Sequence, residues 1–161
     1  MKRTILTLLL SAASAFAGTP ISFQQLPPGD TLHVTFTSGG CFHFYTYQFD
    51  FQRAATTTAK VTRVEQRWNE TKKQREVSQR IPLGTATLTD AEVAGLDRLL
   101  AFYRSKRAGG CTTVDEITLI QTNGSTTKAT ESYRDATCAT YEMKNLTLLP
   151  LIAKKLKPDT K

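Results

Sequence analysis

Alternating apolar and polar residues predict a β-hairpin in the first third of the chain. One strand carries an apolar set with the period of two of a half-buried strand, Leu32, Val34 and Phe36. The segment FHFYTYQFDF, residues 42–51, continues the alternation after Gly39-Gly40. A two-residue turn at these glycines would need positive φ and would place Ser38 opposite Cys41. This register gathers the odd-numbered aromatics on the core face: Tyr45, Tyr47, Phe49 and Phe51.

The opposite face of this hairpin is polar except at its turn end. There Phe42 and Phe44 stand among threonines, glutamines and an aspartate. Two arrangements could accommodate them. Either a helix covers both rings, or they form an exposed apolar patch that meets a partner.

A second hairpin is predicted from 59–68 and 74–81, with the polar segment 69–73 as its loop. Val61 and Val64 are out of phase for a regular strand, which allows a β-bulge. Charged residues on both strands indicate an edge with one solvated face.

Helix signals are clearest after residue 88. Thr89-Asp90-Ala91-Glu92 fits a capping box with Thr89 as the N-cap, and Gly109-Gly110 would stop the helix. The apolar stripe has helical spacing: Val93, Leu96, Leu99, Leu100 and Tyr103. A second, short helix is expected from Thr147, with Pro150 in its first turn.

A third hairpin is expected between the helices, over 112–122 and 125–133, because Asn123-Gly124 is a strong turn signal. Its register stays open. A two-residue turn places Glu116 opposite Glu131, which is unfavourable for like charges, whereas a three-residue loop places Glu116 opposite Ser132.

These elements predict an α+β fold in one domain, residues 18–161. Short connections favour an antiparallel sheet of about six strands in the order ββββ-α-ββ-α, with two helices packed on one face.

Residues 1–17 have the features of a secretory signal peptide. Lys2 and Arg3 precede a short apolar run, and Ala15-Phe16-Ala17 fits a cleavage site. Cleavage after Ala17 would deliver the chain to the periplasm or the exterior. No stretch is long enough to predict a membrane span.

Charge adds one indication about partners. The net charge is +7, and loss of Lys2 and Arg3 would leave +5. The charges are scattered, so they can serve solubility alone, or draw the chain to an anionic envelope component. Export argues against nucleic acid as the partner.

The three cysteines predict one disulfide in an oxidising compartment. Either register of the third hairpin brings Cys111 near Cys138, which is the preferred pair. Cys41 with Cys111 is the alternative, since each follows a Gly-Gly pair. In both cases one cysteine is left over.

Candidate chemistry is sparse. Cys41 and His43 share a strand face, but His33 lies on the other face, and two ligands are too few for a structural zinc site. The sequence has no G-x-S-x-G or S-x-x-K motif and no glycine-rich phosphate loop. Glu116 and Glu131 are the one pair of carboxylates that the register could bring together. No metal, cofactor or catalytic residue is therefore expected.

The function these features favour is that of a small exported binding protein of unknown ligand. Its expected recognition surface is the turn end of the first hairpin with the outer strand face: Gly39, Gly40, Phe42, Phe44 and His33. Two alternatives remain. One is an envelope hydrolase or a thiol-dependent enzyme, and the other is an inhibitor or immunity-type protein that blocks another protein.

Overall fold

The computed structural model describes residues 20–105, 109–139, 152 and 155–156 of the 161-residue chain. It contains β1 (Asp30–Gly39), β2 (Phe44–Arg53), β3 (Thr57–Asn69), β4 (Gln74–Leu88), α1 (Asp90–Arg104), β5 (Val114–Asn123) and β6 (Thr126–Asp135). The predicted order ββββ-α-ββ is confirmed. The prediction of two helices is not supported, because α1 is the one helix element among the described residues. The second helix, expected from Thr147, falls largely on residues that the structure does not describe. The proposed signal peptide also lies outside the described residues.

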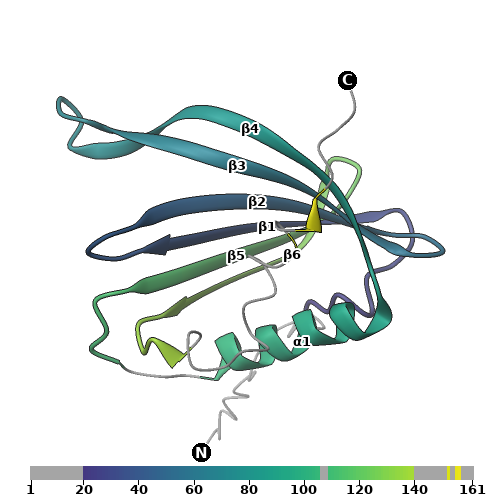
Figure 1. Cartoon of the computed structure of the whole chain (residues 1–161). Helices are drawn as coiled ribbons and strands as arrows, with labels where there is room; N and C mark the ends of the chain where they lie inside the picture. Colours follow the sequence, from purple (N-terminus) through teal and green to yellow (C-terminus); the bar gives the residue numbers. More distant parts are fainter. Residues whose placement is uncertain (1–19, 106–108, 140–151, 153–154, 157–161) are drawn as a thin grey trace, which may run out of the picture.

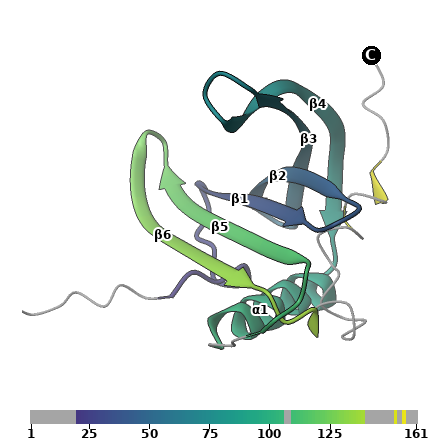
Figure 2. The ribbon, with the colours of Figure 1, turned by 90° about the vertical axis from the view of Figure 1, so that its left-hand side faces the viewer.

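All six strands form one antiparallel sheet in the order β4-β3-β2-β1-β5-β6. After β4 the chain runs back beneath the sheet as α1 and returns as β5 beside β1, so the α1 crossover separates the four-strand meander β1–β4 from the β5–β6 hairpin (Figure 1). Figure 2 shows that the sheet is strongly curved and that α1 covers one side of it. No helix in this described part is long and apolar enough to cross a membrane.

The core lies between α1 and the covered face of the sheet. The capping box at Thr89 and Glu92 is formed, and the whole predicted apolar stripe of α1 is buried. On the sheet, the alternation places Leu32, Val34 and Phe36 of β1 against Phe49 and Phe51 of β2, all at most 5% exposed. Tyr45 and Tyr47 are only partly buried, and they pack at the margin of this core.

The first described residues close the core from the side, which the sequence pattern did not indicate. Ile21, Phe23 and Leu26 are each at most 2% exposed although they belong to no strand or helix. The Asp97 carboxylate on α1 accepts the backbone N–H groups of Phe23 and Gln24, at 2.7 and 3.1 Å. This segment is therefore held by polar groups as well as by burial.

Two predicted registers are corrected by the structure. In the first hairpin Ser38 faces Tyr45 rather than Cys41, because the turn takes up residues 40–43 instead of two glycines. The shift is an even number of residues, so the predicted core face is unchanged. In the third hairpin Glu116 faces Arg134, because the turn lies at Gly124-Ser125 and a bulge follows near Thr122. Neither of the two registers considered for this hairpin is correct.

The β3–β4 hairpin is longer than its pattern predicted. β4 continues past Ile81 to Leu88, through Pro82 and Gly84, which usually interrupt strands. A proline is tolerated here because β4 is an edge strand and because its pairing with β3 shifts beside Pro82. The bulge suspected from Val61 and Val64 is present between Val61 and Thr62, and a second shift follows between Glu65 and Gln66.

A buried carboxylate at the start of β1 gives a prediction for acid stability. Asp30 is 1% exposed and accepts hydrogen bonds from Lys128, Asn123 and Gln121. These bonds, that from Lys128 first, lower the pKa of Asp30 from 3.8 to about 2. A lowered folded-state pKa stabilises the fold fully above pH 3.8, and this stabilisation is lost as the pH falls towards 2.

We therefore expect the wild-type protein to have a larger free energy of unfolding than Asp30→Asn at neutral pH. The difference between the two proteins should narrow between pH 4 and pH 2. Urea unfolding of both proteins across this range measures the difference. Glu70→Gln, on a carboxylate of the β3–β4 turn that is 78% exposed, is the control. A gap between wild type and Asp30→Asn that stays constant with pH would contradict the assignment.

Candidate functional site

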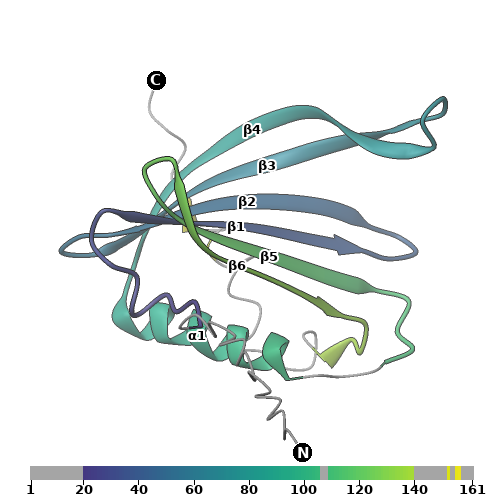
Figure 3. The same cartoon turned by 180° about the vertical axis from the view of Figure 1, so that it is seen from behind.

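The sheet opens between β2 and β3 at the end where the β1–β2 turn lies. Pairing of these strands runs from Arg53↔Thr57 to Thr46↔Val64 and stops there. β2 continues to Phe44 along β1, while β3 continues to Asn69 along β4. The outer half of the β3–β4 hairpin thus leaves the sheet, as seen from both sides in Figures 1 and 3.

A pocket of about 450 Å³ occupies this opening, which we call the slot. Its size is within the range of ligand sites in proteins. It is lined by Phe44, Tyr45, Tyr47, Arg63, Val64, Glu65, Gln66, Arg75 and Ser78. The rings of Tyr45 and Tyr47 lie 5.7 Å apart, and Arg63 pairs with Glu65 at 2.6 Å. The slot therefore combines aromatic surface with arginines.

One side of the slot is closed by a cation–π contact. The guanidinium of Arg75 on β4 lies 3.9 Å from the centroid of the Phe44 ring on β2. Phe44 keeps 39% of its surface exposed under this cover. Because the contact joins two strands that do not pair, Arg75 can move away without breaking a backbone hydrogen bond of the sheet.

Exposed apolar side chains occur on the two segments that flank the same opening. Among the described residues, the large hydrophobics that stay exposed are Phe42 at 101%, Trp68 at 50%, Val77 at 46% and Phe44 at 39%. Phe42 is in the β1–β2 turn, Phe44 begins β2, and the other two are on the outer β3–β4 hairpin. We call these four residues the apolar rim. Of the two arrangements considered for Phe42 and Phe44, the exposed patch is the one observed, since α1 covers the other face.

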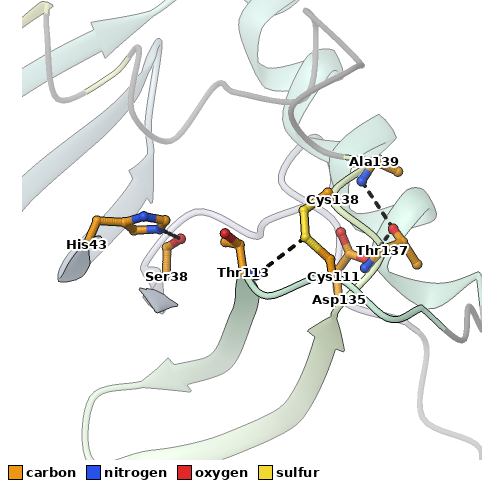
Figure 4. Close-up of a disulfide and its surroundings, with 8 residues drawn as sticks. All are labelled: Ser38, His43, Cys111, Thr113, Asp135, Thr137, Cys138 and Ala139. Atoms are coloured by element: carbon orange, nitrogen blue, oxygen red, sulfur yellow. Dashed lines mark hydrogen bonds between the residues drawn. A yellow bond between two sulfur atoms is a disulfide. The ribbon is translucent and has the colours of Figure 1, made fainter. Parts of the chain in front are cut away.

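The β1–β2 turn is shaped by packing rather than by positive φ. The Gly40 N–H donates to the His43 carbonyl at 2.9 Å, and neither Gly39 nor Gly40 has positive φ. A Cβ on Gly40 would lie 2.8 Å from Thr113 Oγ1 and 2.9 Å from the His43 ring. His43 stacks on Tyr45 and shares a 3.0 Å hydrogen bond with Ser38 (Figure 4). The turn that presents Phe42 is therefore well supported.

His33, the fifth predicted binding residue, is not part of this arrangement. Its ring nitrogens hydrogen-bond to Asp50 at 2.7 Å and Thr122 at 3.2 Å, on strands that flank β1. In the register it lies opposite Asp50, well along β1 from the turn that follows Gly39. The structure brings together Gly39, Gly40, Phe42 and Phe44 and leaves His33 apart. It adds Trp68, Arg75 and Val77, which the sequence analysis missed.

The paired carboxylates considered from the sequence are separated. Glu116 pairs with Arg134, whereas Glu131 accepts from the Ile21 N–H at 2.7 Å and from Arg104 at 2.6 Å. Burial tends to raise the pKa of Glu131, but the hydrogen bonds from Ile21, Arg104 and Tyr133 outweigh it and lower the pKa. Glu131 therefore anchors the first described residues. In the part of the chain described, no three metal-ligating side chains lie close enough together to hold an ion.

The predicted disulfide Cys111–Cys138 is present, just before β5 and just after β6 (Figure 4). Cys41 is the remaining cysteine, and it is exposed beside Phe42. A disulfide is compatible with an oxidising, extracytoplasmic compartment.

This arrangement predicts one accessible thiol. Alkylation of the purified, unreduced monomer is expected to add one adduct, mapped to Cys41 by peptide mass, because the other two cysteines are bonded. After reduction and unfolding, three adducts are expected. Two or three adducts without reduction would contradict the bridge, and an adduct on Cys111 would contradict the pairing.

The chain matches no protein family model, no curated protein and no solved structure. Its function is therefore argued from its own residues.

Proposed function

We propose that this chain is a small exported binding protein, without catalysis of its own, whose recognition surface is the slot with its apolar rim. Export rests on the sequence of residues 1–17 and is supported by the disulfide. The observation that carries the binding role is that the two segments flanking one open pocket hold four exposed large hydrophobics, of which Phe44 lines the pocket itself. Such exposed apolar clusters are typical of surfaces that bind partners.

The composition of the surface supports recognition of a partner rather than folding. Aromatic residues and arginine are the types that dominate binding energy at interfaces. Both types line the slot, and Phe42, two residues before the lining residue Phe44, is fully exposed. The turn that carries Phe42 is held by hydrogen bonds of His43 to Gly40 and Ser38, which limits the entropy that binding would cost. Blocking of another protein's active cleft is one form that such binding could take.

The apolar rim is expected to contribute little to stability. Phe42→Ser should change the free energy of unfolding by less than about 0.5 kcal/mol, as surface substitutions do. Phe44→Ser should cost about 1 kcal/mol, because it is partly covered by Arg75. Urea unfolding measures both. A loss of several kcal/mol in either variant would show that these rings belong to the core, and the proposed surface would then be wrong.

Binding itself is tested by comparison of variants. Immobilised wild type, Phe42→Ser/Trp68→Ser and a control, Gln52→Ser, are exposed to envelope extract of the source cells. The proposal expects a stoichiometric partner that wild type and Gln52→Ser retain and the rim variant loses. Gln52 is exposed at the far end of β2, away from the rim. Equal retention by all three proteins would refute the rim as the recognition surface.

A further inference from the structure

We propose that the slot binds an extended, acidic segment of a partner protein, which adds as a strand to the open side of β3. This inference rests on the proposed function and names the partner's chemistry. Strand addition to an exposed sheet edge is a common mode of peptide recognition, in which backbone hydrogen bonds supply affinity and side-chain pockets supply specificity.

The first support is an unpaired strand edge inside the molecule. Within the described residues, β3 from Glu65 to Asn69 pairs with β4 on one side and with no strand on the other. The Ser78 hydroxyl on β4 donates to the Glu65 carbonyl at 3.2 Å, so the backbone groups of Glu65 point towards β4. In an antiparallel strand the N–H and C=O groups of one residue point to the same side, and those of the next residue point to the other side. The backbone groups of Gln66 and Trp68 therefore point away from β4, towards the slot.

The second support is the fit of side chains to a strand that would lie there. Successive residues of an extended chain point to opposite faces of a sheet. On one face an added strand would meet Tyr45 and Tyr47, and on the other it would meet Phe44 and Val64. The Phe44–Arg75 contact lies across one face and would have to shift. Apolar side chains in the partner segment would thus find surface on either face of the slot.

The third support is charge. Residues 63–80 contain six basic and three acidic side chains. Each of the three acids already has a basic partner: Glu65 pairs with Arg63, Glu70 with Lys73 and Glu76 with Lys72. Arg67 lies opposite Glu76 on β4, which Lys72 already pairs with. Arg75 and Arg80 are exposed and form no ion pair with an acid among the described residues. A partner with carboxylates would complement them, whereas a basic one would be repelled.

These observations favour a peptide over an anionic glycan or lipid. Carboxylates or phosphates on a polymer would satisfy the arginines, but they would make no use of the open backbone groups of Gln66 and Trp68, which would stay bonded to water. An extended peptide supplies both the charge and the alternating donors and acceptors that can pair with this edge.

The test is a selection from a random dodecapeptide display library against the wild-type protein. Arg75→Glu removes a cation that lines the slot. Lys60→Glu is the comparison, since Lys60 lies on β3 in the half that pairs with β2, away from the slot. We expect enriched peptides to be rich in Asp or Glu alternating with apolar residues. Arg75→Glu should weaken their binding at least tenfold, and Lys60→Glu less than threefold.

Backbone recognition is tested with the enriched peptide itself. N-methylation at alternate residues removes the donors on one side while side chains and charge remain, and one of the two alternations should weaken binding at least tenfold. In hydrogen exchange, the bound peptide should slow the amides of Gln66 and Trp68 more than that of Arg67, which already faces β4.

The outcomes separate this inference from the proposed function. If no peptide is enriched, or if both N-methylated forms bind as well as the parent, strand addition is wrong. The rim-dependent capture from envelope extract would then still stand on its own. If that capture fails as well, the proposed function fails with it. If the wild type instead bound a glycan or anionic vesicles selectively, and Arg75→Glu did not, the ligand of the slot would belong to that class and the peptide proposal would be wrong.

Discussion

Replacement of both bridged cysteines, Cys111→Ser/Cys138→Ser, is expected to lower the free energy of unfolding by about 3 to 4 kcal/mol. The bridge spans a sequence separation of 27 residues, and the loss of chain entropy in the unfolded state accounts for an effect of this size. The same bond ties the chain before β5 to the chain after β6, so its loss also loosens β6, which pairs with β5 alone among the strands that the structure describes. Guanidinium unfolding of both proteins, fitted with a common slope, measures the difference.

The third cysteine supplies the control. Cys41→Ser should change stability by less than about 0.5 kcal/mol, because its side chain is exposed and unbridged. Reduction of the wild type should reproduce the effect of the double substitution. A double variant within about 1 kcal/mol of wild type would contradict the expected contribution of the bridge.

The disulfide and α1 could be predicted because their signals are local. A capping box and a stripe at helical spacing fix a helix without knowledge of the rest of the fold. The predicted stop at Gly109-Gly110 was wrong, since α1 ends at Arg104 with Ser105 as its C-cap. The bridge was predicted from the third hairpin alone. The prediction was correct although the predicted register of that hairpin was wrong, because both cysteines lie at the open end of its strands and are close in either alignment.

The turn of the first hairpin shows why faces are easier to predict than partners. Gly39-Gly40 is a plausible two-residue turn, but Gly40 serves close packing against Thr113 on a distant part of the chain. The true turn extends to His43. Because the error was an even number of residues, the core face was right while every cross-strand pair was wrong.

The slot could be predicted only in part. Phe42 and Phe44 were recognised because two aromatics stand on a polar strand face. Trp68 and Val77 lie in a segment of irregular, highly charged pattern, where nothing local indicates that β3 leaves β2 after Val64. Where strand pairing ends depends on the curvature of the whole sheet, which one strand's sequence does not encode.

Least predictable was the role of Asp97 on α1, and its removal gives the second large expected effect. Its carboxylate accepts from the Ser22 hydroxyl at 2.8 Å and from the N–H groups of Phe23 and Gln24. Asp97→Ala would leave the Phe23 amide, in a residue that is 1% exposed, without an acceptor. A buried unsatisfied donor costs about 1 to 3 kcal/mol. Loosened packing of Ile21 and Phe23 adds to this, so we expect a loss of about 2 to 4 kcal/mol in all.

The neighbouring residue provides a matched control. Arg98→Ala removes a charged side chain from the exposed face of the same helix and should cost less than about 0.5 kcal/mol. Asp97→Asn keeps one acceptor oxygen and should fall between the two. Chemical denaturation gives the energies, and hydrogen exchange at Phe23 and Gln24 should quicken in Asp97→Ala alone. If Asp97→Ala and Arg98→Ala were equally stable, the first described residues would be held by apolar burial, with the hydrogen bonds to Asp97 contributing nothing measurable.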